Sequence, residues 1–332
     1  MRIRCAPDSR VRLLRSPVFN MLRRIARAGR RFELTWRYSF NLAPTLAYRL
    51  RRRSFSDESA RVLAELDRNG VAVTSVQRLL GSESCYEELK QAVATAEHDL
   101  AEEIEAARAD SQSNRTVGAK SFIYSLLGET PTLHPQGIYA RFALHGSILN
   151  IANGYLGMYT RLRYYNVWHT FASGAEPRQS QLWHRDREDR YICKVFVYLS
   201  DVDEAAGPFT YASRTHGKGD IRSEPAYFEE AGGVRRSSDT QMAAAVPPEH
   251  WVRATGPAGT IIFADTRGYH KGGEAHGNDR IMYTCMFTSP ASESHEFLQR
   301  PAQLATPPGI ELAFALAPPK PGLWLSMRPE SS

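Results

Sequence analysis

His184 and Asp186 stand two residues apart, and this spacing constrains how the chain folds around them. In a β-strand, residues two apart project from the same face, so the imidazole and the carboxylate can bind one metal ion together. His270, far downstream, offers a second imidazole. Two histidines and one carboxylate on one side of an ion leave its other positions open, an arrangement typical of non-haem Fe(II) sites.

The sequence around each candidate ligand predicts strands. β-Branched and aromatic residues fill residues 191–199, shortly after Asp186, and residues 259–265, shortly before His270. Similar runs cover residues 161–169 and 280–288. Such runs are typical of buried strands, so we expect a mainly β domain in which the two ligand segments meet.

Two basic side chains on these strands are candidates for binding a cosubstrate. If 2-oxoglutarate binds the iron through its keto-acid end, its far carboxylate needs a cation nearby. Arg280 opens the strand 280–288 and offers a planar guanidinium to that carboxylate. Lys194 shares a strand face with Phe196 and Tyr198, and a lysine facing into a barrel needs an anion. Lys194 is therefore the rival of Arg280.

Three segments carry a family pattern in order: residues 183–186 (Trp-His-Arg-Asp), residues 199–209 (Leu-Ser-Asp-Val through Gly-Pro-Phe), and His270 with Arg280. In these segments the chain resembles the phytanoyl-CoA dioxygenase family of Fe(II)- and 2-oxoglutarate-dependent oxygenases, over about residues 55–289. The resemblance implies a double-stranded β-helix of the jelly-roll, cupin-like kind with flanking helices. It also implies that His184, Asp186 and His270 bind iron and that Arg280, rather than Lys194, binds 2-oxoglutarate.

The resemblance bears on two further positions. A similarly placed asparagine in some relatives suggests that Asn166 donates a hydrogen bond to the iron-binding end of 2-oxoglutarate, although an asparagine satisfied by the backbone fits equally well. Many family members carry a hydroxyl residue two positions after the second histidine, where this chain has Gly272. They also often have a Pro-Gly-Ser-His turn where this chain has residues 212–216.

The implied activity is hydroxylation of a C–H bond in a small-molecule metabolite, with O₂ as oxidant and with succinate and CO₂ as coproducts. The metal supplies the difficult chemistry, so no catalytic acid or base beyond the three ligands is expected. Asp186 argues against halogenation, because chloride must take the place of that carboxylate. The alternative is a non-catalytic, cupin-like metal-binding or scaffold protein that uses the same three ligands.

Basic residues are concentrated at the N-terminus. The net charge is +6, but residues 1–53 contain fifteen Arg against Asp8 and Glu33, a balance of +13 that leaves −7 for the rest. Within this Arg-rich arm, taken as residues 1–54, an apolar stripe follows helical spacing at Val18, Leu22, Ile25, Phe32 and Trp36. The pattern permits a helix packed on the main domain, a membrane-surface helix, a transit segment or a nucleic-acid arm. We expect a cytoplasmic protein with no nucleic-acid partner and, at most, weak peripheral membrane contact through the arm.

The remaining chain is expected to form one oxygenase domain over residues 55–300, followed by a Pro-rich extended wrap over residues 301–332. Residues 221–250 form a long irregular insertion, interpreted as a lid over the barrel mouth. Ser56 is expected to cap a helix that runs to about Arg68 and is stopped by Asn69-Gly70, and a longer helix is expected over residues 83–108. The four cysteines are widely spaced, so free thiols are expected rather than disulfides.

Overall fold

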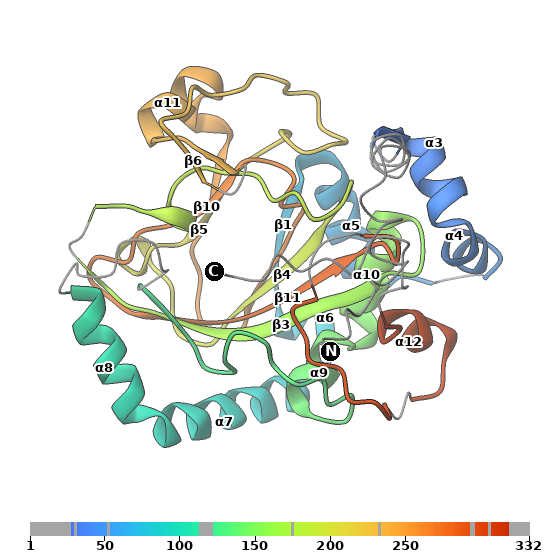
Figure 1. Ribbon diagram of the computed structural model, residues 1–332, viewed down its shortest axis with the longest axis horizontal. Helices are drawn as coiled ribbons and strands as arrows, with labels where there is room; N and C mark the ends of the chain where they lie inside the picture. Colours follow the sequence, from blue (N-terminus) through green and yellow to red (C-terminus); the bar gives the residue numbers. More distant parts are fainter. Residues whose placement is uncertain are drawn as a thin grey trace, which may run out of the picture.

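Two antiparallel β-sheets face each other and form the scaffold of the protein (Figure 1). The computed structural model describes residues 28–29, 32–51, 54–112, 122–173, 176–231, 234–292, 296–304 and 307–318. The larger sheet has the strand order β1 (Val71–Ser75), β9 (Thr260–Ala264), β4 (Cys193–Tyr198), β11 (Arg280–Thr288), β3 (Arg161–Thr170) and β2 (Ile123–Ser125). The smaller sheet has the order β10 (His270–Gly272), β5 (Phe209–Ala212) and β8 (Trp251–Ala254). This architecture confirms the expected mainly β fold of the jelly-roll kind with flanking helices.

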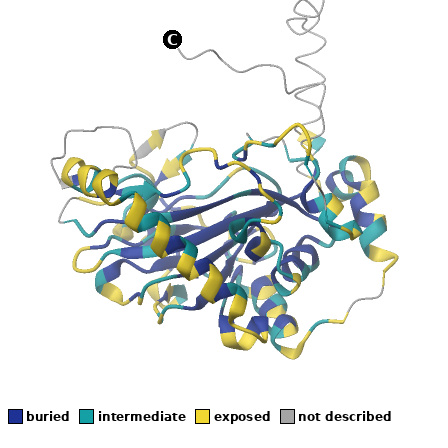
Figure 2. Ribbon diagram, turned by 90° about the horizontal axis from the view of Figure 1, so that it is seen from below, coloured by how far each residue is buried: buried dark blue, intermediate teal, exposed yellow. Residues whose placement is uncertain are grey.

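The pleat of the larger sheet separates two hydrophobic clusters. Phe196, Tyr198 and Met282 point between the sheets, where they meet Phe209 and Tyr211 of the smaller sheet. Alternate residues of the same strands point to the opposite face and pack against helices. This alternation follows from the two-residue period of a strand. Figure 2 shows the strands as a buried layer next to helices with exposed outer surfaces.

Helices cover the outer face of the larger sheet: α5 (Asp57–Asn69), α6 (Val76–Leu80), α7 (Ser84–Asp99), α9 (Ile138–Ala143) and α10 (Gly146–Leu156). Helix α5 begins as predicted, because the Ser56 hydroxyl accepts the backbone N–H of Ser59. It ends at Gly70, which has φ 80°. A Cβ at Gly70 would lie 2.3 Å from the hydroxyl oxygen of Tyr211, so both the backbone conformation and the close packing require glycine.

The single helix expected over residues 83–108 is wrong, since the chain forms α7 and then α8 (Ala101–Gln112). Leu100, between them, leaves the helical conformation with φ −107° and ψ 18°. The bend lets both helices reach one end of β3, where Glu97 binds His169 and Arg108 binds Asp279. A straight helix would separate residues 97 and 108 by about 16 Å along its axis.

The insertion at residues 221–250 is more regular than its sequence suggested. It contains the hairpin β6 (Glu229–Ala231) and β7 (Val234–Arg236), the helix α11 (Asp239–Ala245) and the 3₁₀ turn η4 (Pro248–His250). Ser237 exchanges two backbone hydrogen bonds with Trp183, the residue before His184. Met242 and Val246 pack against the same Trp183. The insertion is therefore anchored beside the first ligand segment, and its movement as a lid stays a prediction.

Part of the Arg-rich arm lies against the main domain. It forms α3 (Glu33–Thr35), the π-helical turn η1 (Trp36–Phe40) and α4 (Leu42–Arg49). Trp36 is fully buried whereas Phe32 is 67% exposed, so these two residues do not share the apolar face expected for them. The other members of that expected stripe, Val18, Leu22 and Ile25, lie outside the described residues.

The Pro-rich tail is not extended throughout. Residues 310–315 form α12 (Ile310–Ala315), and Phe314 stacks on Tyr159 at 5.4 Å between ring centroids. Residues 319–332 lie outside the described part. Cys85, Cys193 and Cys285 are free thiols, as expected, and Cys5 is not among the described residues. No helix in the described ranges has the length and apolar character needed to cross a membrane.

Candidate metal centre

His184 and His270 lie opposite each other on neighbouring backbone segments. Each donates its backbone N–H to the carbonyl of the other, at 3.0 Å in both directions. Opposite residues in an antiparallel pair project to the same side. The bridge therefore brings two imidazoles that are far apart in the sequence to a ring-centroid distance of 4.3 Å.

The backbone also fixes the tautomer of both rings. Nδ1 of His184 lies 2.8 Å from the carbonyl oxygen of Leu182, and Nδ1 of His270 lies 3.1 Å from that of Gly268. A carbonyl oxygen only accepts, so Nδ1 carries the proton and Nε2 carries the lone pair that a metal requires. A Cβ at Gly268 would lie 2.0 Å from the Tyr211 hydroxyl oxygen, which explains the glycine at this position.

Asp186 completes the group. Its Oδ1 lies 3.8 Å from Nε2 of His184, and its Oδ2 lies 3.8 Å from Nε2 of His270. All three ligand atoms fall within 4.8 Å of one another, and no other cluster of this kind occurs in the part of the chain that the structure describes. The structure thus brings together the three residues that the sequence singled out, and two nitrogens with one oxygen suit a divalent transition metal.

Lys194, at the start of β4, neutralises the Asp186 carboxylate. Its Nζ lies 2.8 Å from Oδ2 of Asp186, and both side chains are nearly buried. Burial is the largest single influence on Asp186 and would raise its pKa, but Lys194 and the two neighbouring histidines together outweigh it and hold that pKa well below its usual range. Burial, reinforced by the neighbouring His270, lowers the pKa of His184 to about 3. At neutral pH the centre therefore presents neutral imidazole and ionised carboxylate, the forms that bind metals.

The loop before β10 holds Asp186 from its backbone side. The Asp186 N–H donates to the carbonyl of Thr266 at 2.8 Å, and Nη1 of Arg267 donates to the Asp186 carbonyl at 3.0 Å. Asp265 anchors this loop, because its buried carboxylate accepts the Tyr155 hydroxyl at 2.5 Å and the Arg267 N–H at 3.0 Å. Burial raises the pKa of Asp265 to about 6. The buried carboxylate of Asp265 thus orders the loop that holds the backbone of Asp186.

Arg280 is a buried cation for which the described residues supply no acidic partner. Only 3% of it is exposed, Nη1 donates to the Gly207 carbonyl, and Nη2 lies 3.5 Å from Oγ1 of Thr170. Its Nε has no hydrogen-bond partner, and no carboxylate of the described residues pairs with the guanidinium. A Cβ at Gly272, two residues after His270, would lie 3.7 Å from Nη2. The guanidinium therefore lies beside the strand that carries the second histidine.

The other two cosubstrate candidates have partners within the chain. Lys194 pairs with Asp186, as described above, which does not favour it as the clamp for the far carboxylate. Nδ2 of Asn166 donates to the Gly128 carbonyl at 2.8 Å, and its Oδ1 accepts the Val167 N–H at 2.8 Å. These contacts fit the alternative in which the backbone satisfies Asn166, and a bond from it to the cosubstrate stays a prediction.

Two side chains of the centre were missed in the sequence. Glu188 is partly buried near Asp186, and burial followed by the charge of Asp186 raises its pKa. Tyr164 lies with its hydroxyl oxygen 3.4 Å from Oγ1 of Thr284 and with its ring 5.9 Å from Nζ of Lys194. Tyr164 could have been found from the two-residue period, since it shares a face of β3 with Asn166. Glu188 lies in a bend outside any strand, and no local pattern marked it.

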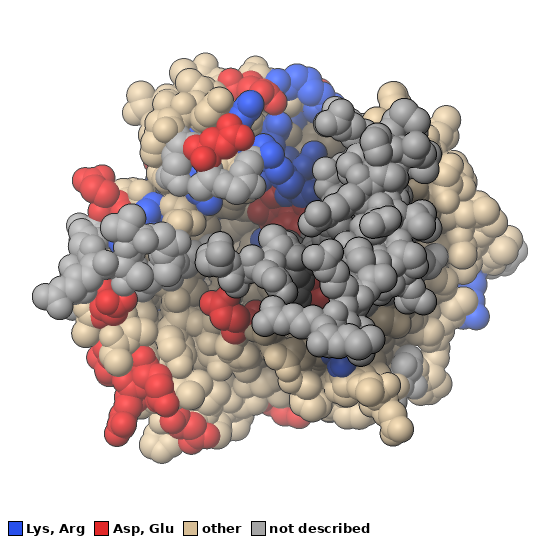
Figure 3. Space-filling model, viewed as in Figure 1, with Lys and Arg blue, Asp and Glu red and all other residues tan. Residues whose placement is uncertain are grey.

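Arginines flank the ligand segments. Arg185, between the two ligands, lies 3.8 Å from the ring centroid of Tyr269 and forms an ion pair with Glu224 at 3.7 Å. Figure 3 shows basic side chains gathered in the upper part of one face, with acidic side chains among them, close to where Figure 1 places α11 and β6. The surroundings of the centre are thus strongly charged.

Comparison with known proteins gives likeness in fold only. No protein-family model matches the sequence, and no curated protein matches it. Solved structures with a similar fold include the epimerase SnoN with Fe³⁺, alpha-ketoglutarate and nogalamycin RO (TM-score 0.46, 16% identity, covering 70% of this chain and 84% of that chain). A second is AviO1 from Streptomyces viridochromogenes (TM-score 0.47, 17% identity, covering 73% of this chain and 99% of that chain). A third is EctD from S. alaskensis with 2-oxoglutarate and 5-hydroxyectoine (TM-score 0.48, 17% identity, covering 78% of this chain and 93% of that chain). At such identities, residue roles in this chain follow from its own geometry.

Proposed function

We propose that this protein is an Fe(II)- and 2-oxoglutarate-dependent dioxygenase of the phytanoyl-CoA dioxygenase kind, which hydroxylates a C–H bond of a small-molecule metabolite and releases succinate and CO₂. One observation carries the proposal: a two-histidine, one-carboxylate group lies in the same barrel as a buried arginine that lacks an acidic partner among the described residues. A buried guanidinium without a counter-ion is unfavourable. A carboxylate ligand would supply that counter-ion.

Each residue has a distinct task in this proposal. His184 and His270, through Nε2, and Asp186, through its carboxylate, would hold Fe(II) on one side. The bound iron supplies oxygen activation coupled to decarboxylation of 2-oxoglutarate. Arg280 would bind the far carboxylate of the cosubstrate. The Thr170 hydroxyl, 3.5 Å from Nη2 of Arg280, would offer the hydrogen bond that Gly272 lacks a side chain to make.

Lys194 contributes orientation and charge balance. Because its ammonium holds Oδ2 of Asp186 at 2.8 Å, the carboxylate is fixed before any metal arrives. The ammonium also offsets the charge of Asp186, so a divalent ion in the centre would keep both of its positive charges for a ligand. A dicarboxylate such as 2-oxoglutarate matches that charge.

The proposal is tested by anaerobic titration of the purified chain with Fe(II) and then with 2-oxoglutarate, followed by a succinate-release assay in air. We expect one Fe(II) per chain, a metal-to-ligand charge-transfer band on addition of 2-oxoglutarate, and iron-dependent succinate release. His184→Ala and Asp186→Ala should lose all three. His134→Ala replaces an exposed histidine outside the centre and serves as the matched control.

Two outcomes would count against the proposal. Normal succinate release by Asp186→Ala would show that the iron site has been assigned to the wrong residues. Stoichiometric metal binding without any band or succinate would favour the alternative, a metal-binding scaffold without turnover. Succinate release alone does not identify the substrate, so a screen of candidate metabolites scored by hydroxylated product completes the test.

A further inference from the structure

The N-terminal helical segment has an apolar face that the described part of the chain leaves exposed. Eight large hydrophobic residues of the described chain are exposed, and six of them lie between residues 32 and 50. Five are spaced four residues apart and form what we call the outward stripe: Leu34, Tyr38, Leu42, Leu46 and Leu50. Leu34 and Leu50, at its two ends, are 71% and 84% exposed. Residues four apart on a helix are neighbours, so Leu42, Leu46 and Leu50 follow one another along α4 and its C-cap. Leu34 and Tyr38 precede them on α3 and the turn η1.

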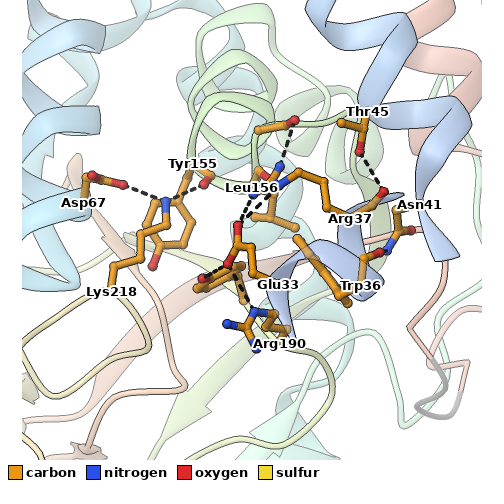
Figure 4. Close-up of polar contacts among 12 residues, drawn as sticks. Glu33, Trp36, Arg37, Asn41, Thr45, Asp67, Tyr155, Leu156, Arg190 and Lys218 are labelled. Atoms are coloured by element: carbon orange, nitrogen blue, oxygen red, sulfur yellow. Dashed lines mark hydrogen bonds and ion pairs between the residues drawn. The ribbon is translucent and has the colours of Figure 1, made fainter. Parts of the chain in front are cut away.

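The inward face of the same segment is mixed: Arg37, Asn41 and Thr45 lie on it together with Trp36 (Figure 4), and Pro44 is buried there too. Arg37 donates to the Leu156 carbonyl at 2.9 Å and pairs with Glu33 at 2.7 Å. The buried side chains of Asn41 and Thr45 donate to backbone carbonyls of the segment itself, at 3.0 and 3.4 Å. Of its larger apolar side chains, Trp36 is fully buried, and its Nε1 donates to Oδ1 of Asp189 at 2.8 Å.

This distribution departs in part from the one that folding favours. A surface helix normally turns its apolar stripe to the core and its polar residues to water. Here Trp36 and Pro44 follow this rule, but the polar Asn41 and Thr45 are also buried while Leu42, Leu46 and Leu50 face outward. The exposed leucines therefore contribute little to the stability of the fold. Contiguous exposed apolar residues of this kind mark an interaction surface.

The charges beside the outward stripe identify the partner. Arg49 and Arg51 are exposed at its C-terminal end, and the Arg49 guanidinium lies 5.4 Å from the ring centroid of Tyr38. Glu33 is the only acidic residue between residues 32 and 51, and it is turned inward to Arg37, Arg190 and Tyr191. We propose that the outward stripe docks this protein on an anionic lipid bilayer, with leucines in the interface and arginines on lipid headgroups.

A second copy of the chain fits this surface less well. In a parallel pairing, two outward stripes would bring Arg49 and Arg51 of both copies together. In an antiparallel pairing, these arginines would lie at the Leu34 end of the other copy, where Glu33 is already engaged by Arg37, Arg190 and Tyr191. Like charges brought together in this way oppose association. The fifteen arginines of residues 1–53 strengthen the same preference for an anionic surface.

The docking surface is attached directly to the metal centre. Asp189, which accepts the Trp36 indole N–H, is three residues beyond Asp186, and its Oδ2 accepts the backbone N–H of Ser289 at the end of β11. Tyr191, two residues further on, donates to Glu33 and packs edge-on against Trp36 at 5.4 Å. A bilayer bound to the outward stripe would therefore be held in a fixed position relative to the ligand segment.

The experiment is vesicle co-sedimentation of the full-length protein, with vesicles of phosphatidylcholine alone or with 30% phosphatidylserine. We expect binding to the anionic vesicles that weakens with salt, and binding at least about tenfold weaker in the Leu42→Ser/Leu46→Ser variant. The matched control is Tyr227→Ser/Phe228→Ser, which replaces the two exposed hydrophobic residues outside the segment and should bind like the wild type. Circular dichroism of each variant verifies folding.

The contrary outcomes are distinct. Equal sedimentation of the wild type and the stripe variant would assign any binding to the remaining arginines and overturn the role of the stripe. If the wild type did not sediment with either kind of vesicle, the proposal that the protein binds a membrane would be wrong. A wild-type dimer in light scattering that the stripe variant converts to monomer, without vesicle binding, would assign the surface to a second copy. None of these readouts depends on iron or on catalysis.

Discussion

The metal centre and the outward stripe depart from the usual distribution of side chains in opposite directions. The centre buries an ion pair, two imidazoles and a lone guanidinium inside a barrel, whereas the stripe leaves five large apolar side chains in water. Burial of charge and exposure of leucine both lower stability unless something else compensates. In each region the compensation is missing from the described chain, which indicates a ligand in one case and a surface in the other.

In both regions, some residues have their interaction partners inside the chain, and others have none among the described residues. Lys194 and His169 are buried cations or potential cations with acidic partners inside the chain. Arg280 has none among the described residues. The buried Trp36 donates a hydrogen bond to Asp189, whereas the side chain of Leu46 is 44% exposed. Mutation should therefore affect stability in the first group and binding in the second.

The largest effect is expected for the two faces of the N-terminal segment. Trp36→Ala should lower the free energy of unfolding by about 3–5 kcal/mol, because a fully buried indole and its hydrogen bond are lost. Leu46→Ala, on the exposed face, should change it by less than about 0.5 kcal/mol. Urea denaturation of both variants tests this, and equal losses would mean that the stripe belongs to the core after all.

Arg280→Ala should weaken binding of 2-oxoglutarate. Truncating one partner of a buried, charge-assisted pair loses about 2–5 kcal/mol, so the apparent affinity should fall at least 30-fold, with Lys194→Ala affecting mainly metal affinity. Isothermal titration of the iron-loaded variants separates the two effects. If Lys194→Ala abolishes 2-oxoglutarate binding while Arg280→Ala keeps it, the clamp has been placed on the wrong strand.

Metal binding should stabilise the fold by linkage. At a free Mn(II) concentration of 100 times Kd, chosen to avoid oxidation of iron, the folded state should gain about 2.7 kcal/mol. His270→Ala should lose this gain, and thermal melts with and without metal measure it. A metal-dependent shift that persists in His270→Ala would point to binding elsewhere in the chain.

The smallest effect concerns a buried charge whose partners are already in place. Burial alone would lower the pKa of His169, but hydrogen bonds to Glu97 and Asp279 outweigh it and raise that pKa. Its stabilising contribution is therefore complete below about pH 6.5, the value for an unfolded chain, and is lost as the pH rises through the higher folded value. Wild type should lose about 1 kcal/mol more than His169→Gln between pH 6.5 and pH 9. Urea denaturation at both pH values measures this difference. An equal loss of unfolding free energy in the two proteins would contradict this role of His169.

Local patterns of the sequence predicted the scaffold well. Strand period placed Arg280 on the inner face, and the capping serine with Asn69-Gly70 marked both ends of α5. The spacing of His184 and Asp186 placed two candidate ligands on one side. These features depend on residues close together in the chain, where backbone geometry alone decides the outcome.

Features that depend on distant contacts were not predictable in the same way. The alternation of β4 showed that Lys194 points inward, but not that Asp186 lies opposite it. Helical spacing grouped Phe32 with Trp36, while the π-helical turn and the partner Asp189 turn only Trp36 inward. The break at Leu100 follows from contacts of Glu97 and Arg108 with one site across the sheet. Such contacts override local propensity.

The backbone bridge between His184 and His270 has a consequence for how the protein comes apart. The two residues are separated in the chain by β4, the insertion and β9, so bringing them together costs loop-closure entropy, and we expect the metal site to form late in folding. A contact made after the folding transition state slows unfolding and leaves the folding rate nearly unchanged. The bound ion should therefore slow unfolding of the native barrel and lengthen its lifetime, while the rate of folding stays nearly the same.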